Sequence, residues 1–360
     1  MPPADDNTEL DASEVLIRRE GRAGRITLNR PRAINALRYE MVAPIYDALA
    51  AWQSDPNVAL VILDGAGDRG LCAGGDVVSL YHSRVTEGSG LARRFWSDEY
   101  RLNALIGRYP KPFVAVQDGI VMGGGIGLSG HASHRIVTER SMLAMPETAI
   151  GLIPDVGGTW LLAHAPGEIG VYLGLTGHRM NAGDALYANF ADTCVSAASL
   201  PGLIETLSFS DEPISVAIAA VATAPAPSPL AEHRGEIDSA FAASTVEAIR
   251  DRLASMPGEF AARQLKDLAS RSPSSLKATL AAIRNARTLP SLEAALAVEY
   301  RLTVRLFEAG EFPEGVRALL IDKDRKPAWK PPRLEDLHQG QVDALFAPLP
   351  AGEDWRASPA

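Results

Sequence analysis

Hydrophobic and polar positions in the first 65 residues follow, in turn, the periods of two strands, a helix and a third strand. Residues 14–19 and 25–28 are strand-like and are joined by the segment Gly21 to Gly24, which is typical of a hairpin. Residues 39–53 carry apolar side chains at helical spacing, and residues 58–63 form a continuous apolar run. Strand, helix and strand in this order predict a parallel βαβ unit with a right-handed crossover.

The next part of the chain combines a helix, a buried strand and a glycine triplet. Residues 88–107 have a helical pattern, and the apolar run 112–116 has the β-branched and aromatic content of a buried strand. Three glycines, residues 123–125, follow, and residues 126–130 are compatible with a helix. Glycine lets a ligand approach bare N–H groups, and a helix N-terminus favours negative charge. The pattern therefore predicts an oxyanion-binding turn at the start of a short helix.

Beyond this region the pattern becomes almost entirely helical. Helical periods at residues 167–175 and 182–188 complete a body that ends near residue 205, and a Pro/Ala-rich stretch at 222–229 interrupts helix formation. Amphipathic helices then extend to about residue 320, before a charged, proline-rich tail that we expect Trp329 to anchor. We predict an α/β core, a connector and a C-terminal helical region with an extended tail, over residues 12–205, 206–229 and 230–345.

Composition narrows the class of protein. The 360-residue chain is 46% hydrophobic and has a net charge of -9, so its overall field does not attract nucleic acid or anionic lipid. Its apolar runs are too short to span a membrane. Two cysteines are too few for a disulfide framework, and the acidic first 14 residues lack the pattern of an export or import signal. We predict a cytoplasmic protein without nucleic-acid or membrane partners, and the sequence leaves open whether it forms a homo-oligomer.

Two carboxylates placed beside proline or glycine are candidates for chemistry. Glu147 follows a proline, and Asp155 lies between a proline and a nearby pair of glycines. Acids at the ends of elements can act as a general base, a nucleophile or a substrate clamp, although each could instead be a surface carboxylate or a helix cap. A second glycine-rich turn, residues 65–76, follows the apolar run 58–63, at the end of a strand where ligands of open α/β sheets bind. The two glycine-rich turns can therefore face one another.

Three motifs suggest other chemistry and are disfavoured by their context. Residues 125–130 match the GxGxxG of dinucleotide-binding folds, but the apolar run 134–137 follows too soon to leave room for a crossover helix. His131 and His134 lack a cysteine or acidic partner at ligand spacing, so we predict no metal site. The chain has no G-x-S-x-G segment, which weighs against a serine hydrolase with a nucleophile elbow.

Several of these segments resemble one known family. Residues 112–158 and the loop Cys72-Ala73-Gly74-Gly75-Asp76 are similar to the crotonase (enoyl-CoA hydratase/isomerase) superfamily. Within it, the run AMPETAIGLIPDVGG and the tail resemble the 3-hydroxyisobutyryl-CoA hydrolase family. The resemblance covers nearly the whole chain and is weakest at residues 195–270. It implies an α/β protein with a crotonase-like ββα-superhelix core, an acyl-CoA thioester substrate and no metal or redox cofactor, since CoA arrives as part of the substrate.

The resemblance also implies which residues form the site. The backbone N–H groups of Gly75 and Gly124 would form an oxyanion hole, and Glu147 would be the nucleophile or general base. The other implied contacts are those of Asp155 with the attacking water or the substrate hydroxyl, Glu99 near that hydroxyl, the Ala73 carbonyl near the adenine of CoA, and Arg32 near the CoA phosphates.

One position separates the hydrolase pattern from the hydratases of the superfamily. The hydratases have a glutamate three residues after the second oxyanion donor, where this chain has Gly127. Adding water across a double bond needs a pair of carboxylates. We therefore predict hydrolysis of a short-chain hydroxyacyl-CoA, with 3-hydroxyisobutyryl-CoA of valine breakdown as the implied substrate. The alternatives are an enoyl-CoA hydratase or isomerase, and a catalytically inactive or RNA-binding protein of the same fold.

Overall fold

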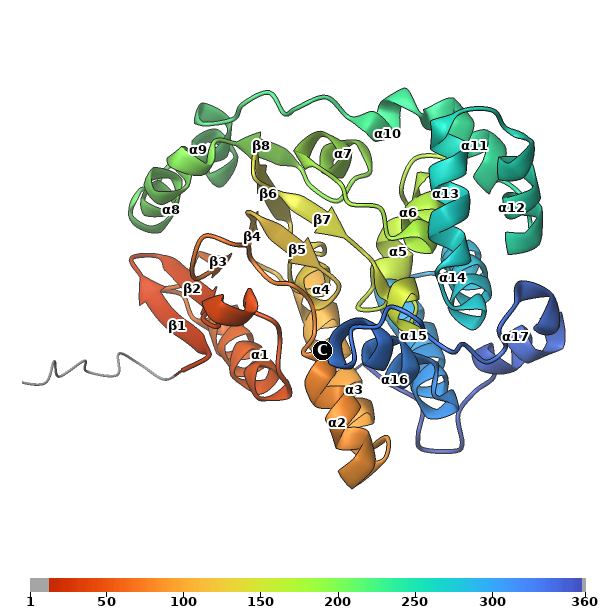
Figure 1. Cartoon of the computed structure of the whole chain (residues 1–360). Coiled ribbons are helices and arrows are strands. Elements are labelled where there is room, and N and C mark those ends of the chain that lie inside the picture. Colours follow the sequence, from red (N-terminus) through yellow and green to blue (C-terminus); the bar gives the residue numbers. More distant parts are fainter. Residues whose placement is uncertain (1–12, 358–360) are drawn as a thin grey trace, which may run out of the picture.

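The computed structural model describes residues 13–357 (Figure 1). The predicted lack of an N-terminal signal and the first residue of the predicted core lie outside these residues. Within the part described, no helix is both long enough and apolar enough to cross a membrane.

A six-stranded sheet supports the rest of the fold. Its strands run in the order β1-β2-β3-β4-β6-β8; β1 and β2 are antiparallel, and the other neighbouring pairs are parallel. The first turn is tight, because Glu20 pairs with Ala23. β2 and β3 are parallel and α1 connects them, so the predicted hairpin and parallel βαβ order are confirmed. The strands of this sheet are β1 (Val15–Glu20), β2 (Ala23–Leu28), β3 (Leu60–Gly65), β4 (Phe113–Gln117), β6 (His134–Thr138) and β8 (Thr193–Val195).

Different helices cover the two faces of the sheet, because successive strand residues point to opposite faces. Leu60 and Ile62 pack in a cluster with α8 (Leu200–Phe209) and α9 (Ile214–Ala220). Val61 and Leu63 belong to the larger core, which also includes apolar side chains of α1 (Tyr39–Ser54) and α3 (Gly90–Gly107). Figure 1 shows α8 and α9 beside the sheet, well away from the C-terminal helices α13 (Glu259–Ala269) to α16 (Glu311–Val316).

A small second sheet brings the two glycine-rich turns together. It consists of the parallel strands β5 (Ile120–Met122) and β7 (Met142–Ala144). The Cys72 N–H donates to the Ile120 carbonyl at 3.1 Å, and the Met122 N–H donates to the Cys72 carbonyl at 2.9 Å. The turn after β3 therefore runs beside the glycine triplet that follows β5. The expectation that the two turns face one another is confirmed.

Most helices lie where the hydrophobic pattern predicts them. The prediction missed α2 (Val77–Glu87), α5 (Gly158–Ala163), α8, α9 and α17 (Gln339–Phe346). The start of α2 is marked by Asp76, whose side chain caps the helix by accepting the Ser79 N–H at 3.2 Å. The helices up to residue 220 are α1 (Tyr39–Ser54), α2 (Val77–Glu87), α3 (Gly90–Gly107), α4 (Gly124–Ser129), α5 (Gly158–Ala163), α6 (Ile169–Thr176), α7 (Ala182–Tyr187), α8 and α9. Those from residue 229 onward are α10 (Pro229–Glu232), α11 (Arg234–Phe241), α12 (Val246–Ser255), α13 (Glu259–Ala269), α14 (Pro273–Ala286), α15 (Leu292–Ala309), α16 (Glu311–Val316) and α17 (Gln339–Phe346).

The C-terminal helices share one hydrophobic core with the sheet. A single cluster of buried apolar residues extends from Val15 to Trp355. α15 packs against α3, and α14 packs against α5 and α6. The predicted α/β class with a helical C-terminal region is confirmed, whereas the boundaries on either side of residues 206–229 stay predictions.

Trp355, and not Trp329, anchors the end of the chain. Trp355 is 5% exposed, and its Nε1–H donates to the Ser97 carbonyl at 2.9 Å. Trp329 is only half-buried and, within residues 13–357, is not a member of the core cluster. The prediction for Trp329 was wrong because its neighbouring residues, rich in proline and lysine, form an irregular and largely exposed segment.

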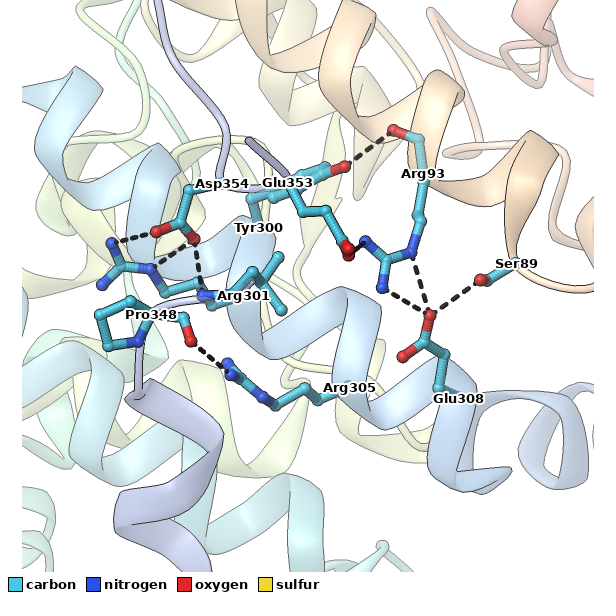
Figure 2. A network of polar contacts seen from close by, with 10 residues as sticks. Ser89, Arg93, Tyr300, Arg301, Arg305, Glu308, Pro348, Glu353 and Asp354 are labelled. Atoms are coloured by element: carbon cyan, nitrogen blue, oxygen red, sulfur yellow. Dashed lines mark hydrogen bonds and ion pairs between the residues drawn. The ribbon is translucent and has the colours of Figure 1, made fainter. Parts of the chain in front are cut away.

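Polar contacts also hold the end of the chain against α3 and α15 (Figure 2). Arg93 of α3 forms ion pairs with Glu308 at 2.8 Å and with Glu353 at 2.9 Å. Arg301 of α15 forms two hydrogen bonds with Asp354, at 2.9 and 3.0 Å. The tail therefore fastens to the two 18-residue helices α3 and α15.

Candidate active site

A cavity of about 490 Å³ lies between the two glycine-rich turns and the C-terminal helices. This volume is in the range of small-molecule sites. Arg32 lies in the short 3-10 helix Pro31–Ala33, is exposed and is not part of the cavity lining, so its contact with CoA phosphates stays a prediction. The other predicted site residues all line the cavity: Ala73, Gly75, Glu99, Gly124, Glu147 and Asp155.

The backbones of the two turns lie close together at Gly75 and Gly124. A Cβ on Gly124 would lie 3.2 Å from the Gly75 nitrogen. The Leu37 N–H donates to the Gly74 carbonyl, and the Leu37 carbonyl accepts the Asp76 N–H. In this bridge the N–H of Gly75 points away from Leu37. Gly124 is the first residue of α4, so its N–H has no intrahelical acceptor. Within residues 13–357 neither N–H has a hydrogen-bond acceptor, and the cavity is therefore flanked by two unpaired donors.

Glu147 begins the 3-10 helix Glu147–Ile150, shortly after β7. Its side chain is 5% exposed, and its Oε2 is buried without a hydrogen-bond partner among the residues described. Its Oε1 faces Gly123, because a Cβ on that glycine would lie 2.9 Å away. Burial, and then the charge of Asp155, raise the pKa of Glu147 well above its usual value. A carboxyl group with a raised pKa is suited to proton transfer near neutral pH.

Asp155 and Glu99 reach the same cavity from different elements. Asp155 lies in the turn before α5, and the Tyr100 hydroxyl donates to its Oδ2 at 2.7 Å. Burial raises the pKa of Asp155 to about 6, although the hydrogen bond from Tyr100 opposes the rise. Glu99 of α3 is 3% exposed, and its Oε1 has no partner within residues 13–357. Burial and then the charge of Asp155 raise the pKa of Glu99 well above its usual value, so these acids influence one another's protonation.

Packing leaves no room for a side chain at Gly127. A Cβ there would lie 2.6 Å from Val156 Cβ and 2.9 Å from Asn103 Nδ2. Val156 and Asn103 therefore occupy the space that an acid projecting from α4 would need. The glycine noticed in the sequence is required by its neighbours in the fold.

Comparison with known proteins shows the family of the chain. The family described as "Enoyl-CoA hydratase/isomerase" matches residues 23–346. The chain belongs to this family, the crotonase family. Over 347 residues it is 42% identical to "3-hydroxyisobutyryl-CoA hydrolase, mitochondrial" of Gallus gallus, covering 94% of this chain and 90% of the relative. The human protein of the same name is 40% identical over 347 residues, covering 94% of this chain and 89% of the relative.

Solved crotonase-family structures share the whole fold. A carnitinyl-CoA dehydratase from Mycobacterium thermoresistibile superposes with a TM-score of 0.91 at 44% identity, over 96% of this chain and 99% of that chain. An enoyl-CoA hydratase from Rhodobacter sphaeroides 2.4.1 superposes with a TM-score of 0.90 at 45% identity, over 96% of this chain and 100% of that chain. The predicted crotonase-like core with C-terminal helices is confirmed.

Sequence reasoning missed two structural features around this cavity. The first is Glu299 of α15, which is buried and accepts the Gly157 N–H at 2.7 Å and the Thr159 N–H at 2.9 Å. The sequence did contain a signal for Glu299, which lies within the apolar run ALAVEYRL. An acid on a buried helix face needs a partner, because acids are seldom fully buried without one. The second is the cavity wall from the C-terminal region, which no local motif marks and which consists of Arg271, Phe312, Leu319 and Leu320.

Glu299 should make the stability of the protein depend on pH. Burial raises the pKa of Glu299 to about 8, against the effect of its hydrogen bonds. An unfolded glutamate titrates at about 4.3, so the folded protein binds this proton more tightly and loses stability as pH rises from there to about 8. We expect the melting temperature of Glu299→Gln, relative to the wild type, to rise across this interval in calorimetry. A difference that stays constant with pH would contradict the raised pKa.

Proposed function

We propose that this chain hydrolyses a short-chain hydroxyacyl-CoA thioester, with 3-hydroxyisobutyryl-CoA as its substrate and valine catabolism as its role. The observation that carries the proposal is the setting of Glu147. Its carboxyl group is buried in the cavity flanked by two backbone N–H groups that have no acceptor among residues 13–357, and no second acid can project from Gly127. Identity of 40–42% to 3-hydroxyisobutyryl-CoA hydrolases over 94% of the chain supports the same activity.

The carbonyl oxygen of the thioester accepts hydrogen bonds from the N–H groups of Gly75 and Gly124 in this reaction. Negative charge develops on that oxygen when the carbonyl carbon is attacked, and one such donor typically contributes roughly 10²–10³ in rate. The tetrahedral intermediate collapses as the C–S bond breaks, and CoA leaves as a thiolate that takes up a proton. Water supplies the new oxygen of the hydroxy acid.

Glu147 activates the attack by one of two routes. As a nucleophile it forms a mixed anhydride with the acyl group, which water then opens. As a general base it takes a proton from the attacking water. Both routes need the ionised carboxylate, and burial raises the pKa of Glu147, so the rate on either route rises with pH as this group loses its proton.

Asp155 and Glu99 recognise the hydroxyl group of the substrate. The Tyr100 hydroxyl already occupies one oxygen of Asp155, which leaves the other for the attacking water or the substrate hydroxyl. Glu99 Oε1, unpaired within the residues described, provides a further buried partner. A site that hydrogen-bonds a hydroxyl discriminates strongly against acyl groups without one, because its buried polar groups are then left unpaired.

CoA enters as part of the substrate, and the proposed reaction uses no separate cofactor. Ala73 lines the cavity, and we propose that its carbonyl contacts the adenine of CoA. The exposed Arg32 is the proposed partner of the CoA phosphates. A cytoplasmic location stays a prediction, and whether the chain forms a homo-oligomer stays open. The relatives from Gallus gallus and Homo sapiens carry the word mitochondrial in their names.

Release of free thiol from a panel of acyl-CoAs tests the proposal. We expect rapid hydrolysis of 3-hydroxyisobutyryl-CoA and, since binding a hydroxyl can discriminate by about 10⁴, far slower hydrolysis of isobutyryl-CoA, which lacks it. Equal rates for the two thioesters would remove the proposed role of Asp155 and Glu99 in selectivity. Absence of thiol release from every member of the panel would contradict the hydrolase.

A hydratase is the second candidate, because two solved relatives with the same fold carry the titles enoyl-CoA hydratase and carnitinyl-CoA dehydratase. Crotonyl-CoA separates the two activities. Rapid loss of its conjugated absorbance without free thiol would identify a hydratase, whereas we expect this absorbance to persist. Salt-dependent RNA binding without any thioesterase activity would instead support a non-catalytic protein of this fold.

Asp155→Asn should reduce hydrolysis of 3-hydroxyisobutyryl-CoA by about 10²-fold or more. The amide keeps the size of the side chain but loses the negative charge that orients the water or hydroxyl, and a misplaced reactant can cost about 10²-fold in rate. The measurement is kcat and KM by thiol release, together with circular dichroism as a check on folding. Full activity in Asp155→Asn would reduce this acid to a structural partner of Tyr100.

A further inference from the structure

The turn that carries Asp155 has a conformation that its own sequence disfavours. Val156 has a φ of 55° and Gly157 has a φ of 79°, both in the left-handed region. Glycine adopts this region freely, but a β-branched residue such as valine is an outlier there. Such a conformation persists only where the surrounding structure over-determines it. Contacts from other parts of the fold must therefore hold this turn.

Glu299 supplies three of these contacts from α15, far along the chain from the turn. Its Oε2 accepts the Gly157 N–H at 2.7 Å, and its Oε1 accepts the Thr159 N–H at 2.9 Å and the Thr159 hydroxyl. Glu299 is 0% exposed and is not among the residues that line the cavity. It therefore holds the turn from behind, where a substrate does not reach it.

His131 holds the same turn from another side. Its Nε2 lies 2.8 Å from the Val156 carbonyl oxygen. Burial lowers the pKa of His131 to about 4, so the ring is neutral at pH 7 and its Nε2–H donates to this carbonyl. A Cβ on Gly157 would lie 2.4 Å from His131 Nε2, which explains the glycine there. His131, considered in the sequence as a metal ligand, thus has a protein partner.

Tyr100 connects Asp155 with the C-terminal region. Its hydroxyl donates to Asp155, and its ring packs edge-on against Tyr300 and Trp355, with centroid separations of 6.3 and 6.4 Å. The Tyr300 hydroxyl donates to the Arg93 carbonyl at 3.4 Å, as Figure 2 shows. α15 is therefore fixed against α3 at the level where both helices hold the Asp155 turn.

We propose that Glu299 is a positioning residue, which holds the strained turn Asp155-Val156-Gly157 so that Asp155 stays aimed into the cavity. The proposal rests on the proposed hydrolase, because it assumes that Asp155 orients a reactant. Without its two acceptor oxygens the turn relaxes toward an ordinary conformation at Val156. Asp155 then leaves the position that Tyr100 gives it, and a misplacement of about 1 Å can cost about 10²-fold in rate.

Glu299→Gln is the first test, because it keeps the size of the side chain and replaces one acceptor oxygen by an amide NH₂. We expect kcat for 3-hydroxyisobutyryl-CoA to fall about 10²-fold while KM stays within about two-fold. Asp184→Asn is the matched control: Asp184 is 1% exposed, accepts the Ser228 hydroxyl at 2.7 Å and the Leu230 N–H at 2.9 Å, and does not line the cavity. This control should lose stability and keep its kcat. Equal loss of kcat in both variants would overturn the proposal.

A double-mutant cycle with Asp155→Asn separates positioning from a general loss of stability. If Glu299 acts through Asp155, adding Glu299→Gln to Asp155→Asn should change kcat by less than about two-fold, because coupled residues are not additive. A further loss as large as that in the wild-type background would overturn the positioning role.

A crystal structure of Glu299→Gln distinguishes failure of this proposal from failure of the proposed function. We expect Val156 to leave the left-handed region or Asp155 to lose its hydrogen bond with Tyr100. If both features are unchanged, Glu299 is not a positioning residue, whatever the wild-type protein hydrolyses. If they change while the wild type releases no thiol from any acyl-CoA, the proposed function fails and the control of the turn by Glu299 stands.

Discussion

Glu147→Gln should abolish release of the CoA thiol from 3-hydroxyisobutyryl-CoA while leaving the fold intact. Glutamine has the size of glutamate but is neither a nucleophile nor a base, and loss of such a group typically costs about 10²–10⁴ in rate. The buried Oε2 of Glu147 has no hydrogen-bond partner among the residues described, so replacing this oxygen by an amide nitrogen breaks no hydrogen bond there. Removal of a buried carboxyl group also removes its desolvation cost. We therefore expect the melting temperature to stay the same or to increase.

The measurement is single-turnover thiol release, paired with binding of the intact thioester to the variant. Glu168→Gln is a suitable control, because Glu168 is a largely buried glutamate that pairs with Arg287 at 3.0 Å, outside the cavity lining. It should keep the wild-type rate. Turnover close to the wild type in Glu147→Gln would show that another group attacks the carbonyl or activates the water, and Asp155 would be the first to examine.

The sequence contains local signals for both glycine-rich turns and for the acids beside them. Gly124 and Gly127 are required by close neighbours, since a Cβ on either would lie within 3 Å of another atom. Such requirements leave a readable pattern of glycines next to apolar strands. Glu147 is also marked locally, because the strand before it and the short helix that it begins are formed by neighbouring residues in the sequence. These parts of the site could be predicted because each depends on a few adjacent positions.

Contacts between distant segments could not be predicted in the same way. Glu299 lies 142 residues from Gly157, and no residue around it in the sequence identifies that partner. Leu319 and Leu320 belong to an amphipathic pattern, yet they are 39% and 37% exposed and line the cavity. The left-handed conformation of Val156 runs against the preference of valine and follows from tertiary contacts alone. These features arise from how the C-terminal region packs on the core, which local patterns do not encode.

Buried acids concentrate around this cavity, and the concentration itself is informative. Burial raises the pKa of Glu99, Glu147, Asp155 and Glu299, and Asp155 contributes to the rise at each of the other three. Buried carboxyl groups with raised pKa values reduce stability near neutral pH. Groups perturbed in this way gather at functional sites, where binding and catalysis offset their cost. The cluster therefore supports a reaction that transfers protons or orients a polar substrate.

Gly124→Ala should reduce kcat by about 10²–10³-fold, which is the effect of losing one oxyanion donor. The added methyl group would lie 3.2 Å from the Gly75 nitrogen and 2.8 Å from Glu99 Oε1, in the space between the two turns. The carbonyl oxygen of a thioester could then no longer approach both N–H groups. The helix itself should tolerate the change, because Gly124 is the first residue of α4 and alanine favours helices over glycine by about 1 kcal/mol.

Gly90→Ala is the matched control for this prediction. Gly90 is likewise the first residue of a helix, and the nearest atom to its added Cβ would be Arg94 Nη1 at 3.5 Å, an ordinary contact. We expect this variant to keep the wild-type kcat, so that any loss in Gly124→Ala reflects the space between the turns. Unchanged kcat in Gly124→Ala would contradict an oxyanion site at these amides. The methyl group at position 124 would lie 3.2 Å from the Gly75 nitrogen. In the proposed oxyanion hole it would therefore keep the carbonyl oxygen of the thioester away from the N–H groups of both turns.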